Sequence, residues 1–389
     1  MKLAGRMGRL GTESAFDVLA RARALEAQGR EIVHLEVGEP DFITPEHIRR
    51  AAKEALDRGE THYVPAPGIM PLRETVAAFL ERTGRLRTTP DRVIVTPGAK
   101  PIMFFTILAL CEEGDEVIYP DPGFPMYESI AAFAGATPVP ILLRESNGFR
   151  MDPDELASLV TERTKLVVLN SPHNPCGSAL SARDLEAVAR LAIERDLVVL
   201  SDEIYWDIRY GGGHSSVLDV DGMAERTVLL DGWSKTWAMT GWRLGFGVFP
   251  QALVEPVTRL VINSVSCTSA FSQHAAIAAM TGPMEPAERM VGEFRARRDA
   301  IVTGLNAIEG VSCVTPDGAF YAFPNVTRLG RTSKEIETHL LDVAGVAALS
   351  GTAFGRGGEG YLRFSYANSL ENIERALTAF EASLPQLVR

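Results

Sequence analysis

The stretch VLLDGWSKTWAMTGWR, residues 228–243, is the part of this 389-residue chain that decides its fold and function. A short apolar strand is predicted at 228–230, and Lys235 is the first basic residue after it. Arg243 follows eight positions later, before a second apolar run at 244–249. An amine and a fixed guanidinium at this separation suit a ligand that carries an aldehyde at one end and a phosphate at the other.

Pyridoxal phosphate is a ligand of this kind. Lysine forms a Schiff base with its aldehyde, and arginine makes a permanent, forked contact with its phosphate. A surface lysine and a structural arginine are the ordinary alternative, and a lone Ser-Lys pair would not exclude it. Four other segments of the chain supply the remaining groups of one site, and these favour the cofactor.

The chain reads as alternating short strands and amphipathic helices. Continuous runs of leucine and β-branched residues are typical of strands that are covered on both faces. A helix is predicted at 181–195, where Ser181 can act as the cap and Asp184 favours the first turn. The alternation predicts an α/β fold with a mostly parallel, doubly wound sheet. The strands are predicted at 93–95, 116–119, 166–169, 197–200, 228–230 and 244–249.

The pattern changes after Pro283. A long helix is predicted at 285–308 and a final helix from Leu370. Shorter strands are predicted between them, at 311–314, 320–323 and 361–364. We therefore expect a large cofactor-binding domain at 46–284 and a smaller α+β domain formed by 1–45 and 285–389.

Five of the predicted strands run directly into distinctive polar segments. In open α/β sheets, ligands bind beyond the carboxyl ends of the strands. If these strands are parallel, the five segments converge on one edge of the sheet. They are TPGAK (96–100), PDPGF (120–124), NSPHNPCG (170–177), SDEIY (201–205) and DGWSK (231–235).

Two of these segments offer binding surfaces for the ends and faces of a cofactor. The turn Gly98-Ala99-Lys100 opens an apolar helix, whose first backbone N–H groups can bind a phosphate. Its alternative is a plain strand-to-helix turn. Phe124 can stack on an aromatic ring, or it can be one more buried aromatic side chain.

Three polar side chains are candidates for the ring itself. Asn174, held between two prolines, can donate to the cofactor's phenolic oxygen or to a substrate carboxylate, or it can form a turn. Asp202 ends a buried strand, where a carboxylate is costly unless it is paired. A protonated pyridine nitrogen would pair it and keep the ring an electron sink, although an arginine or a helix end could also do so. Tyr205 can donate to the phenolic oxygen or pack in the core.

Composition narrows the possible partners. The formal net charge of −11 argues against nucleic acid or an anionic membrane as a partner. The four cysteines contain no C-x-x-C pair, which fits a reduced, cytoplasmic protein without a structural metal. Basic residues near the N-terminus are not followed by an apolar signal core. The longest apolar stretch, 102–111, is about half of the ~20 residues that a membrane span needs.

Six motifs, in order and spacing, resemble those of fold-type I pyridoxal-phosphate-dependent enzymes, and specifically the class I aminotransferase family, aspartate-aminotransferase-like. The resemblance extends over nearly the whole chain. The motifs are LEVGEPDF (35–42), HYVPAPG (62–68), SPHNPCG (171–177), SDEIY (201–205), WSKTWAMTGWRLGF (233–246) and LRFSYANS (362–369).

The resemblance implies a role for each candidate in cofactor binding. Lys235 would be the Schiff-base lysine, and Asp202 would pair with the pyridine nitrogen. Tyr205 and Asn174 would hold the phenolic oxygen, and Phe124 would stack on the ring. The phosphate would be held by Arg243, Ser234 and the turn Gly98, Ala99 and Lys100.

The resemblance also implies a substrate site and a partner. Arg363 would clamp the substrate α-carboxylate, helped by Asn174 and by the backbone of Gly38. Considered alone, Arg363 is only an arginine within an apolar strand. Tyr63 would reach the phosphate in a neighbouring subunit, which implies a homodimer with shared active sites.

The activity implied by the resemblance is transfer of an amino group from an L-amino acid to a 2-oxo acid by a ping-pong mechanism, with Lys235 as general base. A lyase or decarboxylase on the same scaffold is the first alternative. A non-catalytic sensor domain of a transcription regulator is the second, and the acidic charge and the lack of a basic helix-turn-helix region count against it.

Several positions leave the details of binding open. Ala99, Cys176 and Gly232 depart from residues common in the family, which concerns binding detail rather than reaction type. Lys100 could contact the distal carboxylate of an acidic substrate or could cap a phosphate. Phe16 favours apolar or aromatic side chains instead, so the choice of amino acid stays open at this point.

Overall fold

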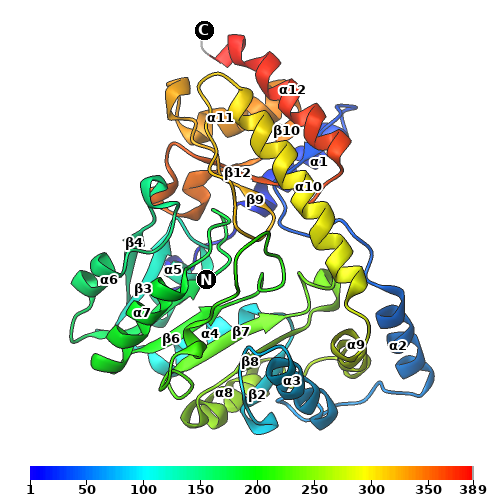
Figure 1. Cartoon of the computed structure of the whole chain (residues 1–389), viewed down its shortest axis with the longest axis vertical. Helices are drawn as coiled ribbons and strands as arrows, with labels where there is room; N and C mark the ends of the chain where they lie inside the picture. The colour runs from blue at the N-terminus through cyan, green and yellow to red at the C-terminus, as the bar shows by residue number, and fades with distance from the viewer. Residues whose placement is uncertain (388–389) are drawn as a thin grey trace.

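A seven-stranded sheet forms the centre of the computed structural model, which describes residues 1–387 (Figure 1). All the predicted strands up to residue 249 are found in this sheet. In spatial order its strands are β2 (Val93–Thr96), β8 (Gly245–Val248), β7 (Thr227–Gly232), β6 (Val198–Asp202), β5 (Thr164–Asn170), β3 (Glu116–Asp121) and β4 (Thr137–Leu142).

The sheet is mostly parallel, and only β8 runs against the other strands. The pairs from β7 through β6, β5 and β3 to β4 are all parallel. Strands β2 and β7 are each antiparallel to β8, so they share one direction. The carboxyl ends of β2, β3, β5, β6 and β7 therefore meet at one edge, as expected, and the chain enters β8 from that same edge.

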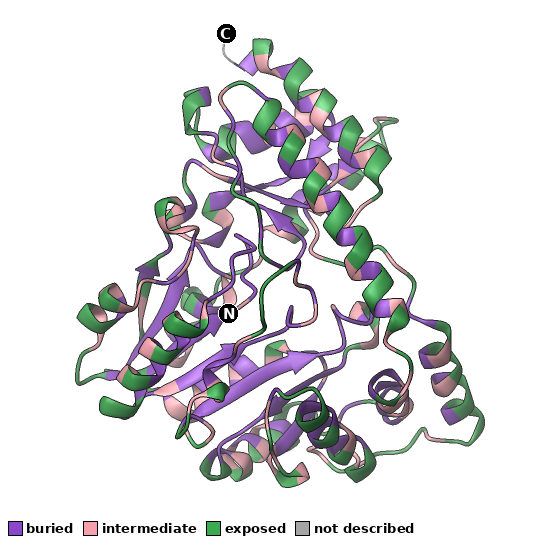
Figure 2. Cartoon of the chain, viewed as in Figure 1, coloured by how far each residue is buried: buried purple, intermediate pink, exposed green. Residues whose placement is uncertain are grey.

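Helices cover both faces of the sheet, which is why its strands are buried (Figure 2). Along β5, Leu166 and Val168 join the core that contains α4 (Lys100–Leu110), whereas Val167 and Leu169 join the core that contains α7 (Ala182–Glu194). Because side chains alternate along a strand, an uninterrupted apolar run fills both cores. The helices of this part are α2 (Glu46–Asp57), α3 (Met70–Arg82), α4 (Lys100–Leu110), α5 (Met126–Ala134), α6 (Pro153–Leu159), α7 (Ala182–Glu194), α8 (Gln251–Ser264) and α9 (Ala270–Thr281).

Helix α7 begins as its sequence predicts. The Ser181 hydroxyl accepts a hydrogen bond from the Asp184 backbone N–H at 3.2 Å, and the Asp184 carboxylate accepts one from the Ser181 N–H at 3.0 Å. This reciprocal pair satisfies two N–H groups that have no partner within the helix. The predicted helix at 181–195 is confirmed.

The elements α1 and β1 and those after residue 284 form a second group, mostly in the upper part of Figure 1, whereas the N-terminus itself lies in the middle of that view. Strand β1 (Val33–His34) pairs with β10 (Val346–Ala347), so the N-terminal segment is joined to the C-terminal part of the chain. The predicted helices at 285–308 and from 370 are confirmed. The elements are α1 (Ala15–Glu26), β1 (Val33–His34), α10 (Glu285–Ala307), β9 (Tyr321–Ala322), α11 (Ser333–His339), β10 (Val346–Ala347), β11 (Leu349–Ser350), β12 (Leu362–Ser365) and α12 (Leu370–Leu387).

One prediction in this second group is wrong. Residues 311–314 form no strand, only a single antiparallel bridge between Ser312 and Asn325. The predicted strands at 320–323 and 361–364 correspond to β9 and β12. We propose that the domains divide at 45/46 and 284/285, because β1 pairs with β10 and α10 packs against α12.

Membrane-spanning helices and metal-ligand clusters are both absent from residues 1–387. No helix there has both the length and the apolar character that a membrane crossing requires. No three His, Cys, Asp or Glu side chains in the same range are grouped so that they could hold a metal ion.

Candidate active site

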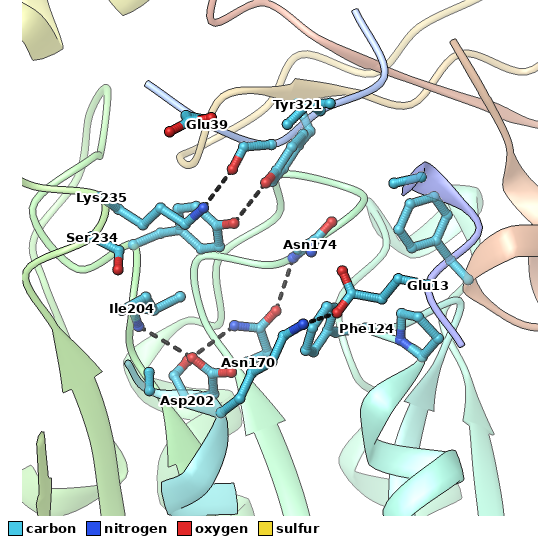
Figure 3. Close-up of a pocket in the computed structure, with 18 of the residues that line it drawn as sticks. Glu13, Glu39, Phe124, Asn170, Asn174, Asp202, Ile204, Ser234, Lys235 and Tyr321 are labelled. Atoms are coloured by element: carbon cyan, nitrogen blue, oxygen red, sulfur yellow. Dashed lines mark hydrogen bonds and ion pairs between the residues drawn. The ribbon is translucent and has the colours of Figure 1, made fainter. Parts of the chain in front are cut away.

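A cavity of about 500 Å³ lies at the edge of the sheet where the five polar segments converge. Segments from the N-terminal and C-terminal parts of the chain close its other sides (Figure 3). Most of the predicted site residues line it, namely Gly38, Ala99, Lys100, Phe124, Asn174, Asp202, Tyr205, Ser234, Lys235, Arg243 and Arg363.

Two predicted residues do not line this cavity. Gly98 lies just behind the lining, where a Cβ atom would collide with the Arg243 guanidinium. Tyr63 is 90% exposed and lies outside the cavity of its own chain. A role for Tyr63 at the phosphate therefore requires a second subunit.

The Lys235 amine points into the cavity and has one hydrogen-bond partner, the Gly38 carbonyl oxygen at 2.5 Å (Figure 3). Burial, together with the nearby positive charge of Arg363, lowers the pKa of Lys235 to about 8. A larger fraction of this amine is therefore neutral near pH 7 than for an ordinary lysine. The neutral form is the nucleophile that a carbonyl group requires.

Asp202 is buried at the end of β6 and accepts two hydrogen bonds. The Tyr127 hydroxyl donates to its Oδ2 at 2.7 Å, and the Ile204 backbone N–H donates to its Oδ1 at 3.2 Å. Burial raises its pKa to about 6, and the bond from Tyr127 opposes this rise. The carboxylate is thus ionised at neutral pH and can pair with a protonated ring nitrogen.

The two asparagines that line the cavity are linked to each other. The Asn170 side chain donates to the Asp202 carbonyl at 3.0 Å and accepts from the Asn174 backbone N–H at 2.8 Å. Asn170 therefore fixes the start of the SPHNPCG segment against β6. Tyr205, from the neighbouring segment, shares a hydrogen bond of 2.7 Å with the Tyr321 hydroxyl.

Arg363 is a buried cation without a carboxylate partner among residues 1–387. Its guanidinium donates to Asn174 Oδ1 at 3.1 Å and to the Glu36 carbonyl at 2.5 Å, and its Nε has no partner. It lies between the rings of Tyr321 and Phe354, with centroid distances of 4.4 and 4.7 Å. Because an unpaired buried cation is costly, this group suits a carboxylate ligand.

Another part of the cavity has the features of an anion site. Gly98 adopts φ +83°, a backbone conformation that is strained for a residue with a side chain. Helix α4 begins two residues later, and its first N–H groups have no partner within the helix. The Arg243 guanidinium donates to the Thr240 carbonyl at 2.8 Å and keeps its other donors available. Ser234 lines the same cavity from the loop after β7.

These groups fit pyridoxal phosphate. The chain offers an amine for the aldehyde, a carboxylate for the ring nitrogen, an arginine with a helix start for the phosphate, and a second arginine for a substrate carboxylate. The arrangement is that of a pyridoxal-phosphate-dependent enzyme whose substrate is an amino acid.

The chain belongs to the aminotransferase class I and II family, whose family model matches residues 30–380. It is similar to an aspartate aminotransferase from Pyrococcus abyssi, with 41% identity over 91% of this chain and 92% of the relative. It is also similar to aromatic-amino-acid aminotransferase 2 from Thermococcus litoralis, with 40% identity over 92% of this chain and 94% of the relative.

A comparison with solved structures also identifies aminotransferases. The structure of an aspartate aminotransferase from Thermus thermophilus with maleate has a TM-score of 0.93 and 36% identity, over 98% of this chain and all of that one. The expected fold-type I architecture is therefore confirmed. The protein is an aminotransferase, and its family implies pyridoxal phosphate as the cofactor.

Several side chains that line the cavity were not predicted from the sequence. Asn170 directly follows the strand predicted at 166–169, so its position at the sheet edge could have identified it. Tyr127 and Tyr321 lie outside the polar segments and reach the site only through the packing of α5 and β9. Glu13 comes from the N-terminal segment, far in sequence from its partner Lys100.

Proposed function

We propose that Lys235 is the cofactor-binding and proton-transferring lysine of this aminotransferase, which moves an amino group from an L-amino acid to a 2-oxo acid. One observation carries the proposal. The Lys235 amine, with a pKa lowered to about 8, shares a cavity with a buried carboxylate and with a buried arginine that lacks a carboxylate partner.

Each group has a distinct task in this proposal. When bound, pyridoxal phosphate supplies an aldehyde for the amine and a cationic ring that accepts electrons from the substrate Cα–H bond. Asp202, held by Tyr127, keeps the proton on the ring nitrogen. Arg363 binds the substrate α-carboxylate, and Lys235 Nζ, once free, accepts the Cα proton as general base.

The remaining predicted residues would bind other groups of the cofactor and the substrate. The Tyr205 hydroxyl and the Asn174 amide would hold the phenolic oxygen, and Phe124 would stack on the ring. Ser234, Arg243 and the turn at Gly98 to Lys100 would bind the phosphate, and the Gly38 backbone would lie near the substrate carboxylate. We further propose a cytoplasmic homodimer whose Tyr63 residues reach across to the partner's phosphate.

A panel of L-amino acids, tested with 2-oxoglutarate, pyruvate and oxaloacetate while cofactor absorbance is followed, tests the activity. A donor alone should leave the aminated cofactor on the enzyme and release one equivalent of 2-oxo acid, as ping-pong transfer requires. A lyase or decarboxylase would instead release ammonia or carbon dioxide over many turnovers without a 2-oxo acid acceptor.

The Lys235→Ala variant tests the role of the lysine. We expect turnover to fall by at least about 10³-fold, because the variant loses both the nucleophile and the general base. Lys165→Ala removes an exposed lysine on β5 outside the cavity and should leave turnover unchanged. Borohydride reduction that attached the cofactor to a lysine other than Lys235 would contradict the assignment.

A further inference from the structure

One cationic side chain that lines the cavity has no task in the proposed binding of the cofactor and of the substrate α-carboxylate. Only the backbone of this residue belongs to the proposed phosphate-binding turn. Four cationic side chains among residues 1–387 line the cavity: Lys100, Lys235, Arg243 and Arg363. In the proposed function, Lys235 binds the aldehyde, Arg243 the phosphate and Arg363 the α-carboxylate. The side chain of Lys100 is therefore the group that a second substrate carboxylate would have to use.

Lys100 already has a carboxylate partner from the protein itself. Its amine forms an ion pair with Glu13, from the segment just before α1 (Figure 3). The amine also lies 5.5 Å from the centroid of the Phe124 ring, and the Lys100 side chain, which is 51% exposed, lines the cavity. The Glu13 side chain is only 18% exposed and lines the cavity with Lys100.

Glu13 lies close enough to the reacting groups to influence them. Its negative charge raises the pKa of both Lys235 and Arg363, although burial has the larger, opposite effect on each. Its carboxylate therefore lies within electrostatic reach of both groups, in the cavity that would receive the substrate. Phe16, three residues later, also lines the cavity, with an apolar ring that is 60% exposed.

We propose that Glu13 neutralises Lys100 within the cavity, so that the side-chain subsite selects L-amino acids with uncharged, apolar or aromatic side chains over dicarboxylic ones. The inference rests on the proposed function, because it assigns the substrate class of that same site. A substrate carboxylate can reach Lys100 only beside Glu13 or in its place. In the first position, repulsion between the two carboxylates disfavours the acidic substrate. In the second, Glu13 loses its ion pair with Lys100, which also disfavours that substrate.

An uncharged side chain avoids both costs. It leaves the Glu13–Lys100 pair intact and can pack against Phe16. The Glu13 carboxylate would then repel an acidic substrate, and removing its charge should improve the reaction with such a substrate.

Single-turnover half-reactions of the cofactor-loaded enzyme, with donor alone and no acceptor, test the proposal. The wild-type enzyme should react with phenylalanine with a higher second-order rate constant for the half-reaction than with aspartate. Glu13→Gln should raise this rate constant for aspartate about tenfold relative to phenylalanine, because the like charge is removed while the shape of the side chain is kept. Asp17→Asn is the matched control: it removes a negative charge from an exposed position in the first turn of α1, outside the cavity, and should leave the ratio unchanged.

A double variant tests whether the gain depends on Lys100. In Glu13→Gln/Lys100→Met, the improvement with aspartate should disappear, because the freed cation is no longer present. The inference is overturned if wild-type enzyme prefers aspartate to phenylalanine, or if Glu13→Gln leaves their ratio unchanged.

Calorimetric binding of unreactive carboxylates separates this inference from the proposed function. Maleate should bind the Glu13→Gln holoenzyme about tenfold more tightly than the wild type, and 3-phenylpropionate should bind both equally. Equal affinity of both proteins for maleate would overturn the inference. Failure of every amino donor to react would refute the proposed function instead, and the binding ratio would still decide the role of Glu13.

Discussion

At the scale of single residues, the pKa of Lys235 should govern how the apoenzyme takes up pyridoxal phosphate, since we propose that this amine binds the aldehyde. The neutral amine attacks an aldehyde, and the protonated amine does not. Because burial lowers this pKa to about 8, the rate of reconstitution with pyridoxal phosphate should rise with pH and level off above an inflection near 8. Stopped-flow absorbance at a series of pH values measures it.

A profile that rose only above pH 10 would show that Lys235 behaves as an exposed lysine and would contradict the prediction. The same experiment with Lys165→Ala serves as the control, because that lysine is exposed and lies outside the cavity. It should reproduce the wild-type inflection.

Sequence predicts a residue of the site when local chemistry marks it. Asp202 ends a buried apolar strand, and Lys235 follows one, so each stands out along the chain. Tyr127 and Glu13 have no such mark, because their partners Asp202 and Lys100 lie 75 and 87 residues away. Such contacts depend on how α5 and the N-terminal segment pack, which periodicity and spacing do not contain.

At the scale of elements, a buried arginine connects the ends of the two strands that lead to Asp202 and Lys235. Arg85 donates to the Asp231 carboxylate of β7 at 2.7 Å and to the Glu203 carboxylate after β6 at 3.0 Å. Its guanidinium also lies 4.3 Å from the centroid of the Trp206 ring. Burial raises the pKa of Asp231 to about 7, and the charge of Arg85 opposes this rise.

Replacing Arg85 with methionine should therefore destabilise the protein. The variant leaves two buried carboxylates without a cation, which typically costs about 3–5 kcal/mol. Urea unfolding followed by circular dichroism measures the loss. Arg87→Met is the matched control: its side chain is 91% exposed, and its pair with Glu81 should contribute less than about 1 kcal/mol. Equal stability of both variants would contradict a structural role for Arg85.

His34 connects β1 to the end of α1 and should make stability depend on pH. Its ring bonds Glu36 at 2.8 Å and Glu26 at 3.1 Å, and these carboxylates raise its pKa from 6.5 to about 9. A raised folded-state pKa contributes stability that is complete below pH 6.5 and is lost as the pH rises through 9.

The variant His34→Gln should therefore unfold more easily at pH 6 than the wild type, by about 1–2 kcal/mol after allowance for solvent screening. The difference should shrink between pH 6.5 and 9, as measured by urea unfolding at each pH. His62→Gln, at an exposed position, should match the wild type throughout. A difference that stayed constant with pH would rule out the ion pairs as its cause.

Strand existence was predictable from sequence, but strand direction was not. The apolar runs marked six strands of the large sheet, and β4 was missed because Pro138 and Pro140 interrupt its sequence. An edge strand tolerates proline, since one side of its backbone needs no partner. The reversal of β8 leaves no trace in composition, because it depends on the path of the chain between Gly232 and Gly245.

At the scale of the whole molecule, the exposed position of Tyr63 makes the assembly testable. If Tyr63 completes the phosphate site of a neighbouring subunit, the protein is a dimer in sedimentation analysis, and Tyr63→Ala and Lys235→Ala should be weakly active or inactive alone. In a mixed dimer of the two variants, one of the two sites is intact.

Refolding an equal mixture of the variants should restore about a quarter of the wild-type sites, because half of the dimers are mixed and each has one complete site. Activity per cofactor after co-refolding measures the recovery, and mixing without refolding is the control. No recovery, together with a monomeric sedimentation coefficient, would show that each chain acts alone.

The reversed strand β8 has a consequence for how the enzyme can move. The loop from Trp233 to Leu244 is the connection of a hairpin, anchored at one end by β7 and at the other by β8. Lys235 and Arg243 therefore lie on one loop whose two ends are fixed by the hydrogen-bonded strands β7 and β8. If these two residues bind the two ends of the cofactor as proposed, the distance between them should stay constant even if the C-terminal part moves during turnover.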